Sequence, residues 1–320
     1  MARLAFFGTP ALAAAQLEAL LASAHEVALV VAQPDRPAGR GKQLQAPPTK
    51  ALALARGIEV AQPETLKKDT PSGEAFFALF SSRNIDLAVV AAYGRIIPRR
   101  LLDVPPRSFV NVHASLLPRW RGAAPIQRAI EAGDATTGVC LMHMVPELDA
   151  GDVYATVAVP ITPSDDGETL TAKVAAAGAR LLAQHIDALA AGTLPRVPQP
   201  AEGVTYAEQL EKEQGRIDWS KSARRVVDHA RAMHPWPGAF TTLGDEVLKL
   251  FAPSMAAGQG APGTVLSSSE GLVVACGDGA ARFADAQLPN KRRMPVAELI
   301  KGRPLPPGTA LGAAAGAGAP

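Results

Sequence analysis

The side chains best suited to chemistry lie in the run FVNVHASLLPRWRGAAPIQ and in the acidic turn LDAGD that follows it. The run contributes Asn111 and His113, and the turn contributes Asp149. Residues at positions i and i+2 of a strand face the same side, so Asn111 and His113 can reach one substrate together. An amide can donate to an oxygen that gains charge during acyl transfer, and an imidazole can exchange protons near neutral pH. The spacing therefore predicts a site that polarises a carbonyl group and moves protons.

Each of these residues has an ordinary structural interpretation when it is considered alone. A lone asparagine is usually a turn residue, and a lone histidine is more often structural than catalytic. Asp149 adds a carboxylate that can orient the imidazole and stabilise its charged form. The combination at strand ends and adjoining turns favours Asn111, His113 and Asp149 as catalytic residues, none of which needs to act as a nucleophile.

The composition limits the classes of protein that the chain can represent. The 320 residues are enough for two domains, 48% of them are hydrophobic, and a formal net charge of +2 excludes a uniformly basic nucleic-acid binder. Cys140 and Cys276 are too few and too far apart for a disulfide framework or a metal cluster, which fits buried thiols in a reducing cytoplasm. No apolar run approaches the roughly 20 residues that a membrane span needs. We expect no metal, no membrane contact and no signal peptide at the N-terminus.

The elements that must position these residues follow an α/β pattern. An apolar strand at Leu4–Phe7, a turn at Gly8-Thr9-Pro10, a helix and a second strand at Val27–Ala32 form a β-α-β unit. Further apolar runs occur at 87–92, 109–112 and 139–145, and a long helix is predicted over 167–191. Residues 1–192 are therefore predicted to form a doubly wound α/β domain, with ligands at the carboxyl ends of its strands. The first turn lacks GxGxxG, which argues against a dinucleotide site.

The remainder of the chain has a different pattern. Three prolines between Thr193 and Pro200 indicate a linker over 193–207. A short basic helix over 222–233 precedes several short strands, which predict a small barrel or sandwich over 208–311. The tail 312–320 contains only alanine, glycine and proline, and is predicted to be disordered.

The segment QPDRPAGRGKQLQAPPTK, residues 33–50, is rich in positive charge. It carries Arg36, Arg40, Lys42 and Lys50 against a single acidic residue, Asp35. A solvated flexible loop and a basic arm that meets phosphate groups remain equally open from composition alone.

Several of these motifs together resemble the folate-dependent formyltransferases. The resemblance is carried by NVHASLLPRWRGAAPI and LDAGD, and QPDRPAGRGK, VTYAEQLEKEQGRIDW and HPWPGAF are similar to the members that act on aminoacylated tRNA. It extends from Phe7 to about Lys291, nearly the whole chain. The resemblance implies a Rossmann-like formyltransferase domain followed by an OB-like β-barrel domain.

The resemblance also implies a reaction and the residues that perform it. The formyl group of 10-formyltetrahydrofolate would pass to the α-amine of methionine on initiator methionyl-tRNA, in a monomeric cytoplasmic enzyme that needs no metal. Asn111, His113 and Asp149 would be catalytic, and Ser115, Leu116, Leu117 and Pro118 would line the folate site. The segment 33–50 would clamp the acceptor end of the tRNA through Arg36, Arg40 and Lys42, with Arg40 as its best candidate for direct contact.

Two other functions stay open at the level of sequence. A formyltransferase that acts on a small amine would share the catalytic residues but would not need the basic segment. A noncatalytic RNA-binding protein built on a decayed enzyme would keep the basic segments but would not need Asn111, His113 and Asp149 intact.

Overall fold

The computed structural model describes residues 1–38 and 43–312, which form two compact units. The first unit comprises Met1–Pro125, Thr136–Pro160 and Thr171–Glu208. The second comprises Ile126–Ala135, Ile161–Leu170 and the chain from Gln209 onward. The second unit thus takes in two short segments from within residues 1–192. The predicted tail beyond Gly312 lies outside the described residues.

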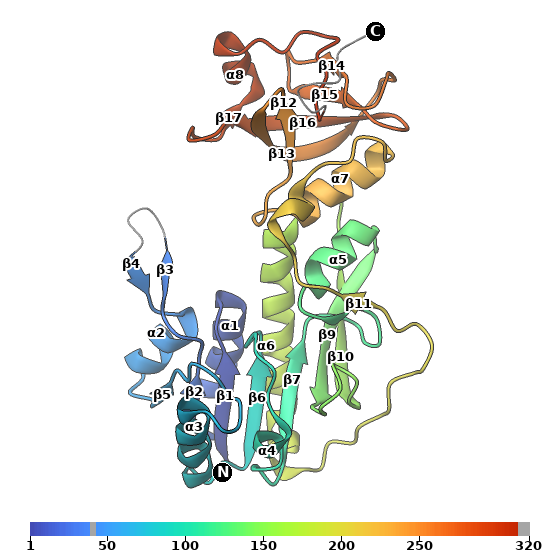
Figure 1. Ribbon diagram of the computed structural model, residues 1–320. Coiled ribbons are helices and arrows are strands. Elements are labelled where there is room, and N and C mark those ends of the chain that lie inside the picture. The colour runs from blue at the N-terminus through green and yellow to red at the C-terminus, as the bar shows by residue number, and fades with distance from the viewer. Residues whose placement is uncertain (39–42, 313–320) are drawn as a thin grey trace. The chain divides into compact units, whose positions relative to one another are not determined.

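A mixed sheet with strand order β10-β9-β7-β6-β1-β2-β5 forms the centre of the first unit (Figure 1). Its strands are β1 (Arg3–Gly8), β2 (Glu26–Val31), β5 (Val60–Ala61), β6 (Leu87–Ala91), β7 (Phe109–His113), β9 (Thr136–His143) and β10 (Val153–Pro160). The first five of these strands are parallel to one another, and β9 is antiparallel to both β7 and β10. The parallel sheet predicted for this part of the chain is confirmed.

Helices cover both faces of this sheet, which accounts for the continuous apolar runs of its central strands. The helices are α1 (Ala11–Leu21), α2 (Pro48–Ala55), α3 (Pro71–Ser82), α4 (Arg99–Leu102) and α6 (Gly167–Ala191). On one face, the ring of Phe7 packs edge-on against Phe76 and Phe80 of α3 and also contacts Phe109 at the start of β7. Because alternate residues of a strand face the same side, positions 111 and 113 of β7 lie on the same face of the sheet as Phe109.

The opposite face of β7 packs closely against α6. A Cβ atom at Gly178 of α6 would lie 3.2 Å from the side chain of Val112 and 3.0 Å from that of Gln16. Gln16, on α1, donates a 3.0 Å hydrogen bond to the backbone carbonyl of Ala175. Because Val112 points into this layer, its neighbours Asn111 and His113 point to the other side of the sheet.

Two small pairs of strands complete the first unit. The antiparallel pair β3 (Arg36–Ala38) and β4 (Gln43–Gln45) leads into α2 and lies beside it, away from the central sheet (Figure 1). The parallel pair β8 (Arg121–Gly122) and β11 (Tyr206–Ala207) joins the segment after β7 to the end of residues 193–207. The predicted linker therefore makes ordered backbone hydrogen bonds within the first unit.

The second unit contains an antiparallel sheet with the order β12-β13-β16-β15-β14, and β17 pairs with β16. Its strands are β12 (Phe240–Leu243), β13 (Glu246–Ala256), β14 (Val265–Ser267), β15 (Leu272–Ala275), β16 (Ala280–Gln287) and β17 (Met294–Pro295). Its helices are α5 (Pro125–Ala132), η1 (Lys212–Gly215), α7 (Ala223–Ala232) and α8 (Val296–Gly302). The predicted run of short strands is confirmed, whereas no closing pair between β12 and β14 makes a barrel among the described strands.

Trp219 anchors the core of this second sheet. Its indole N–H donates a 3.0 Å hydrogen bond to the hydroxyl of Thr241, and its ring meets Phe283 edge-on.

Within the described ranges, no helix combines the length and the apolar character needed to cross a bilayer.

Candidate active site

Asn111 and His113 lie at the end of β7, where the carboxyl ends of the parallel strands lie. Val90 of β6 pairs with Asn111, and β7 ends at His113, whose side chain is only 4% exposed. Phe109, two residues before Asn111, lies in the aromatic core. One face of one strand thus changes from apolar core to polar site within five residues, as the alternation of side chains on a strand allows.

Asp149 reaches these two side chains from the turn between β9 and β10. Its Oδ1 accepts a long hydrogen bond of 3.4 Å from Asn111 Nδ2, and its Oδ2 lies 3.6 Å from His113 Nδ1. The backbone N–H of Gly122 donates to the same Oδ2 at 2.8 Å. The three side chains predicted to act together therefore lie together in the structure, and the carboxylate lies between the other two.

The imidazole of His113 is held on both sides by oxygen atoms. Its Nε2 lies 2.9 Å from the backbone carbonyl of Trp120, and its Nδ1 faces the Asp149 carboxylate. The 3.6 Å separation from Asp149 is longer than a hydrogen bond, so the Trp120 carbonyl is the closer partner of the ring. To donate to a substrate oxygen, Nε2 has to exchange its contact with Trp120 for one with the substrate.

The side-chain amide of Asn111 has spare donor capacity. Its only hydrogen bond among the described residues is the 3.4 Å contact with Asp149, so one amide hydrogen has no protein acceptor there. The side chain is only partly buried. A half-exposed, unused N–H beside an imidazole is suited to an oxygen that gains negative charge.

The loop that follows β7 is held mainly by its own backbone and by β9. Ser115 is fully buried, and its hydroxyl donates a 2.6 Å hydrogen bond to the carbonyl of Arg119. The peptide bond between Leu117 and Pro118 is cis, and Leu117 N–H donates to the thiol of Cys140 at 3.4 Å. Leu116, Leu117 and Pro118 are only partly buried, so their side chains are the part of this loop that can meet a ligand.

The segment 33–50 is fastened to the first unit by a polar network. Lys50 Nζ pairs with the Asp35 carboxylate at 2.7 Å and donates to Gln62 Oε1 at 2.8 Å, while Gln62 donates to Asp35 at 2.7 Å. The hydrogen bond from Lys50, followed by that from Gln62, lowers the pKa of Asp35. Arg36 is exposed, whereas Arg40 and Lys42 lie outside the described residues. Lys50 is therefore neutralised by Asp35, and Arg36 remains the exposed cation of this set that the structure describes.

The basic residues of the second unit have mainly structural partners. Arg231 is buried and pairs with Asp228 at 2.6 Å, and the same carboxylate pairs with Arg224 at 2.9 Å. Arg293 pairs with Asp285 at 2.7 Å, and its guanidinium group lies over the ring of Phe251. All three side chains thus form ion pairs inside the unit, although Arg224 and Arg231 share one carboxylate. The count of positive residues in the sequence does not reveal these pairs.

Gln199, which no sequence motif singles out, also contacts this site. Its amide nitrogen donates to the backbone carbonyls of Asp149 at 2.7 Å and Gly151 at 2.8 Å. Its amide oxygen accepts from two nitrogens of the Arg121 side chain, at 3.1 and 2.8 Å. A glutamine in a proline-rich stretch has no local pattern that could have identified these contacts.

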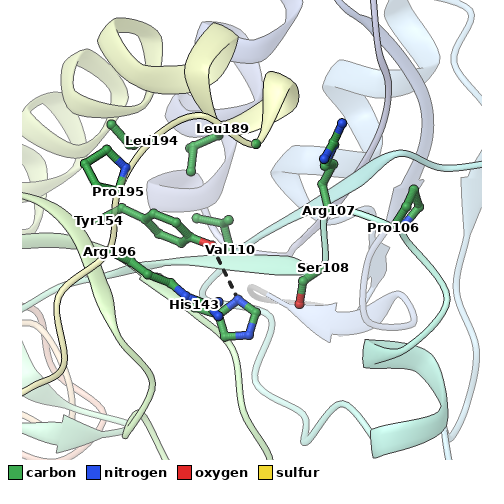
Figure 2. Close-up of a pocket in the computed structure, with 11 residues that line it drawn as sticks. Pro106, Arg107, Ser108, Val110, His143, Tyr154, Leu189, Leu194, Pro195 and Arg196 are labelled. Carbon is green, nitrogen blue, oxygen red and sulfur yellow. Dashed lines mark hydrogen bonds between the residues drawn. The ribbon is translucent and has the colours of Figure 1, made fainter.

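A separate cavity of about 450 Å³ lies at the other end of β7, beside Ser108 and Val110 (Figure 2). Figure 2 shows the hydroxyl of Tyr154 directed at His143, where the oxygen to Nδ1 distance is 3.4 Å. Burial lowers the pKa of His143. Arg196, also on its wall, pairs with Asp152 at 3.3 Å. None of the residues Asn111, His113 and Asp149 lines this cavity.

The described part of the chain holds no group of three or more His, Cys, Asp or Glu side chains arranged to bind a metal ion. The cluster around His113 offers hydrogen-bond donors and a carboxylate, a combination that can stabilise charge developing on an acyl oxygen.

Comparison with known proteins agrees with this kind of site. Residues 2–186 match the formyl transferase family, and residues 209–304 match the formyl transferase C-terminal domain. Fold and site thus define a formyltransferase with both of its characteristic domains. The methionyl-tRNA formyltransferase of Delftia acidovorans is 47% identical over 99% of this chain and 100% of its own length, and that of Aromatoleum aromaticum is 48% identical over 98% of each. The chain belongs to the methionyl-tRNA formyltransferase family.

Solved structures at lower identity share the fold. An N-formyltransferase from Helicobacter canadensis, in complex with folinic acid and dTDP-3-aminofucose, has a TM-score of 0.68 at 16% identity and matches 90% of this chain and 100% of its own. HypX from Aquifex aeolicus, in complex with tetrahydrofolic acid, has a TM-score of 0.62 at 19% identity over 94% of this chain. This chain spans only 47% of the length of that HypX protein.

Proposed function

We propose that the protein transfers the formyl group of 10-formyltetrahydrofolate to the α-amine of methionine on initiator methionyl-tRNA. The observation that carries this proposal is the cluster of Asn111, His113 and Asp149 in a chain 47% identical to methionyl-tRNA formyltransferases over nearly its whole length. The product, N-formylmethionyl-tRNA, serves the initiation of translation.

In the proposed reaction, the neutral amine attacks the formyl carbon, and negative charge develops on the formyl oxygen. The unused amide hydrogen of Asn111 and the Nε2 hydrogen of His113 are the donors for that oxygen. A new bond joins the amine nitrogen to the formyl carbon, and the bond from that carbon to N10 of the folate breaks. The proton lost by the amine goes to N10, with His113 or a water bound to Asp149 as the relay.

Asp149 has two tasks in this scheme. Its carboxylate faces His113 Nδ1 and orients the ring, and it also orients the amide of Asn111. The Gly122 N–H that donates to Oδ2 keeps the carboxylate in place between them. The negative charge of Asp149 therefore supports both donors without contacting the formyl oxygen itself.

The folate donor is assigned to the loop Ser115–Pro118. The half-exposed side chains of Leu116, Leu117 and Pro118 offer an apolar surface to the flat pterin, and buried Ser115 shapes the loop from within. The acceptor end of the tRNA is assigned to Arg36, Arg40 and Lys42, whose charges are suited to phosphate groups.

The finer architecture belongs to the same proposal. The match of residues 209–304 to the formyl transferase C-terminal domain supports an OB-like domain over residues 208–311, which would contact the tRNA. Residues 1–192 would be the catalytic domain, 193–207 the connection, and 312–320 a tail. We propose a monomer that acts in the cytoplasm, where its substrates are found.

One assay tests the function directly. The purified protein is incubated with formyl-folate and charged initiator tRNA, and the aminoacyl ester is hydrolysed and analysed for N-formylmethionine. A parallel reaction contains free methionine amide or an amino sugar nucleotide. Formylation of the tRNA alone supports the proposal, formylation of the small amine alone assigns the enzyme to the other class, and no product in either reaction refutes it.

A further inference from the structure

Gln199 has unusual contacts for a residue of a proline-rich segment predicted to be a linker. It lies in the segment 193–207, yet its single side-chain amide contacts two separate parts of the candidate active site. The amide nitrogen reaches the turn that carries Asp149, and the amide oxygen reaches Arg121 on β8. These two parts are separated by about 30 residues in the chain and are brought together by the fold.

The turn that carries Asp149 needs support from outside itself. Asp149 has a φ of +46°, a left-handed conformation that a residue with a Cβ adopts only when its surroundings impose it. The turn also lies tightly on the end of β9, because a Cβ atom at Gly151 would come 1.8 Å from the carbonyl oxygen of His143. Gln199 donates to the backbone carbonyls of both Asp149 and Gly151, so it holds the backbone of this turn.

The second contact of Gln199 supports a group that contacts the Asp149 carboxylate. Arg121 immediately precedes Gly122, whose N–H donates to Asp149 Oδ2 at 2.8 Å. By accepting from Arg121 at 3.1 and 2.8 Å, the Gln199 oxygen fixes the strand that presents this N–H. Thr205 adds to this attachment, because its backbone carbonyl accepts from Arg121 N–H at 2.9 Å and its hydroxyl accepts from Trp120 N–H at 2.9 Å.

We propose that Gln199 is a positioning residue for the formyl transfer, and that it acts by holding the Asp149 carboxylate against Asn111 and His113. This inference rests on the proposed function. Glutamine suits the task because one planar group supplies both donors and an acceptor. A glutamate keeps the oxygen that faces Arg121 but loses the donors to the two carbonyls, and alanine loses all four hydrogen bonds.

The test compares Gln199→Ala and Gln199→Glu with the natural enzyme, and uses Glu202→Ala as the matched control because Glu202 is an exposed residue of the same segment. We expect kcat to fall by about 10- to 100-fold in both Gln199 variants, the size of effect that follows a misplaced catalytic group, with KM for each substrate changed less than threefold. Glu202→Ala keeps natural values. Unchanged kcat in a folded Gln199→Glu protein would overturn the inference.

A double-mutant cycle separates positioning from general loss of structure. If Gln199 acts through Asp149, Gln199→Ala lowers kcat by less than about threefold when Asp149 is already replaced by asparagine. Equal losses in both backgrounds would contradict the proposal. Should Gln199→Ala fail to fold, Gln199→Glu is carried through the same cycle.

The ring nitrogens of His113 give a readout that does not depend on activity. In protein with ¹⁵N-labelled histidine, Gln199→Glu should shift the His113 signals in the direction that Asp149→Asn shifts them, and Glu202→Ala should leave them in place. Identical His113 signals in Gln199→Glu and the natural protein would refute the positioning role. If the natural enzyme formylates no substrate, the proposed function is refuted instead.

Discussion

At the scale of single residues, the two proposed donors, Asn111 and His113, differ in the contacts that they must break before they can donate to a substrate. Asn111 has an amide hydrogen without a protein acceptor among the described residues, whereas His113 Nε2 already contacts the Trp120 carbonyl at 2.9 Å. A donor that is free before the reaction stabilises charge without first breaking a contact. Asn111 is therefore the preorganised member of the pair, and His113 is the member that can move a proton.

These two assignments predict how the alanine variants behave. Asn111→Ala and His113→Ala should each lower kcat by roughly 100-fold or more, the cost of losing one oxyanion donor or one acid–base group. Steady-state formylation by each variant measures the loss, and near-natural turnover in either variant would contradict its assignment.

The two cysteines illustrate burial at the same scale. Burial raises the pKa of Cys140 and of Cys276 to about 11, and both thiols are buried. At pH 8 the thiolate is then roughly one part in a thousand, and the thiolate is the form that reacts. The folded protein should therefore react slowly with an aromatic disulfide reagent at pH 8, and both thiols should react rapidly in denaturant. Rapid reaction of one thiol per molecule of folded protein would show that the structure around that cysteine opens.

At the scale of elements, the segment 33–50, which we propose to bind tRNA, is held at Asp35 by a polar network. Lys50 and Gln62 surround the Asp35 carboxylate, and the hydrogen bond from Lys50 is the main cause of its lowered pKa. Replacing the carboxylate by an amide removes the ion pair but keeps the shape of the side chain. Residue 35 then loses its ion pair with Lys50, while the exposed charge of Arg36 remains.

Asp35→Asn should consequently raise KM for initiator tRNA by about three- to tenfold and leave KM for the folate unchanged. The reason is that part of the free energy of tRNA binding is then used to order the segment 33–50. Glu59→Gln is the control, since Glu59 forms an exposed pair with Arg83 elsewhere on the first unit. The expected effect also falls as salt is raised, as for other contacts with phosphate. A KM for tRNA that stays natural in Asp35→Asn would show that the network does not hold the arm.

At the scale of the whole molecule, a contact between Glu131 and His229 joins two parts of the second unit that lie far apart in the chain. Glu131 of α5 lies 3.0 Å from His229 Nδ1 on α7 and 2.7 Å from Arg128. The hydrogen bond from His229, followed by that from Arg128, lowers the pKa of Glu131. The segment 126–135 thereby joins α7 within one compact unit, although the strands on either side of it belong to the first.

This lowered pKa has a definite consequence for stability. A carboxyl group with a lowered pKa in the folded state stabilises the fold at pH values above its ordinary value of 4.5, and that contribution is lost as the pH falls through the folded value. Glu131→Gln should therefore reduce the stability of the protein at pH 7 by about 1 kcal/mol, and the difference should disappear in strong acid. Urea unfolding of both proteins at a series of pH values measures it, and a difference that persists in acid would point to packing instead.

Much of the molecule could be predicted because its signals are local. The alternation in FVNVH determines that Asn111 and His113 share a face, and the apolar runs of β1, β2 and β6 determine a parallel sheet. The match to formyltransferase motifs then identified the family. Side-chain periodicity is a property of a few consecutive residues, so it can be recognised in the sequence without knowledge of the fold.

Other features depend on contacts that no local pattern contains. Asp149 meets Asn111 across 38 residues of chain and Gln199 across 50, and Arg231 is a buried ion-pair partner rather than an exposed cation. The conformational strain at Asp149 is tolerated only because such distant groups support it. The sequence by itself determined which side chains could perform the chemistry and which strand carries two of them. The tertiary structure alone decided how the carboxylate reaches them and what holds it there, because those contacts form only when distant segments pack together.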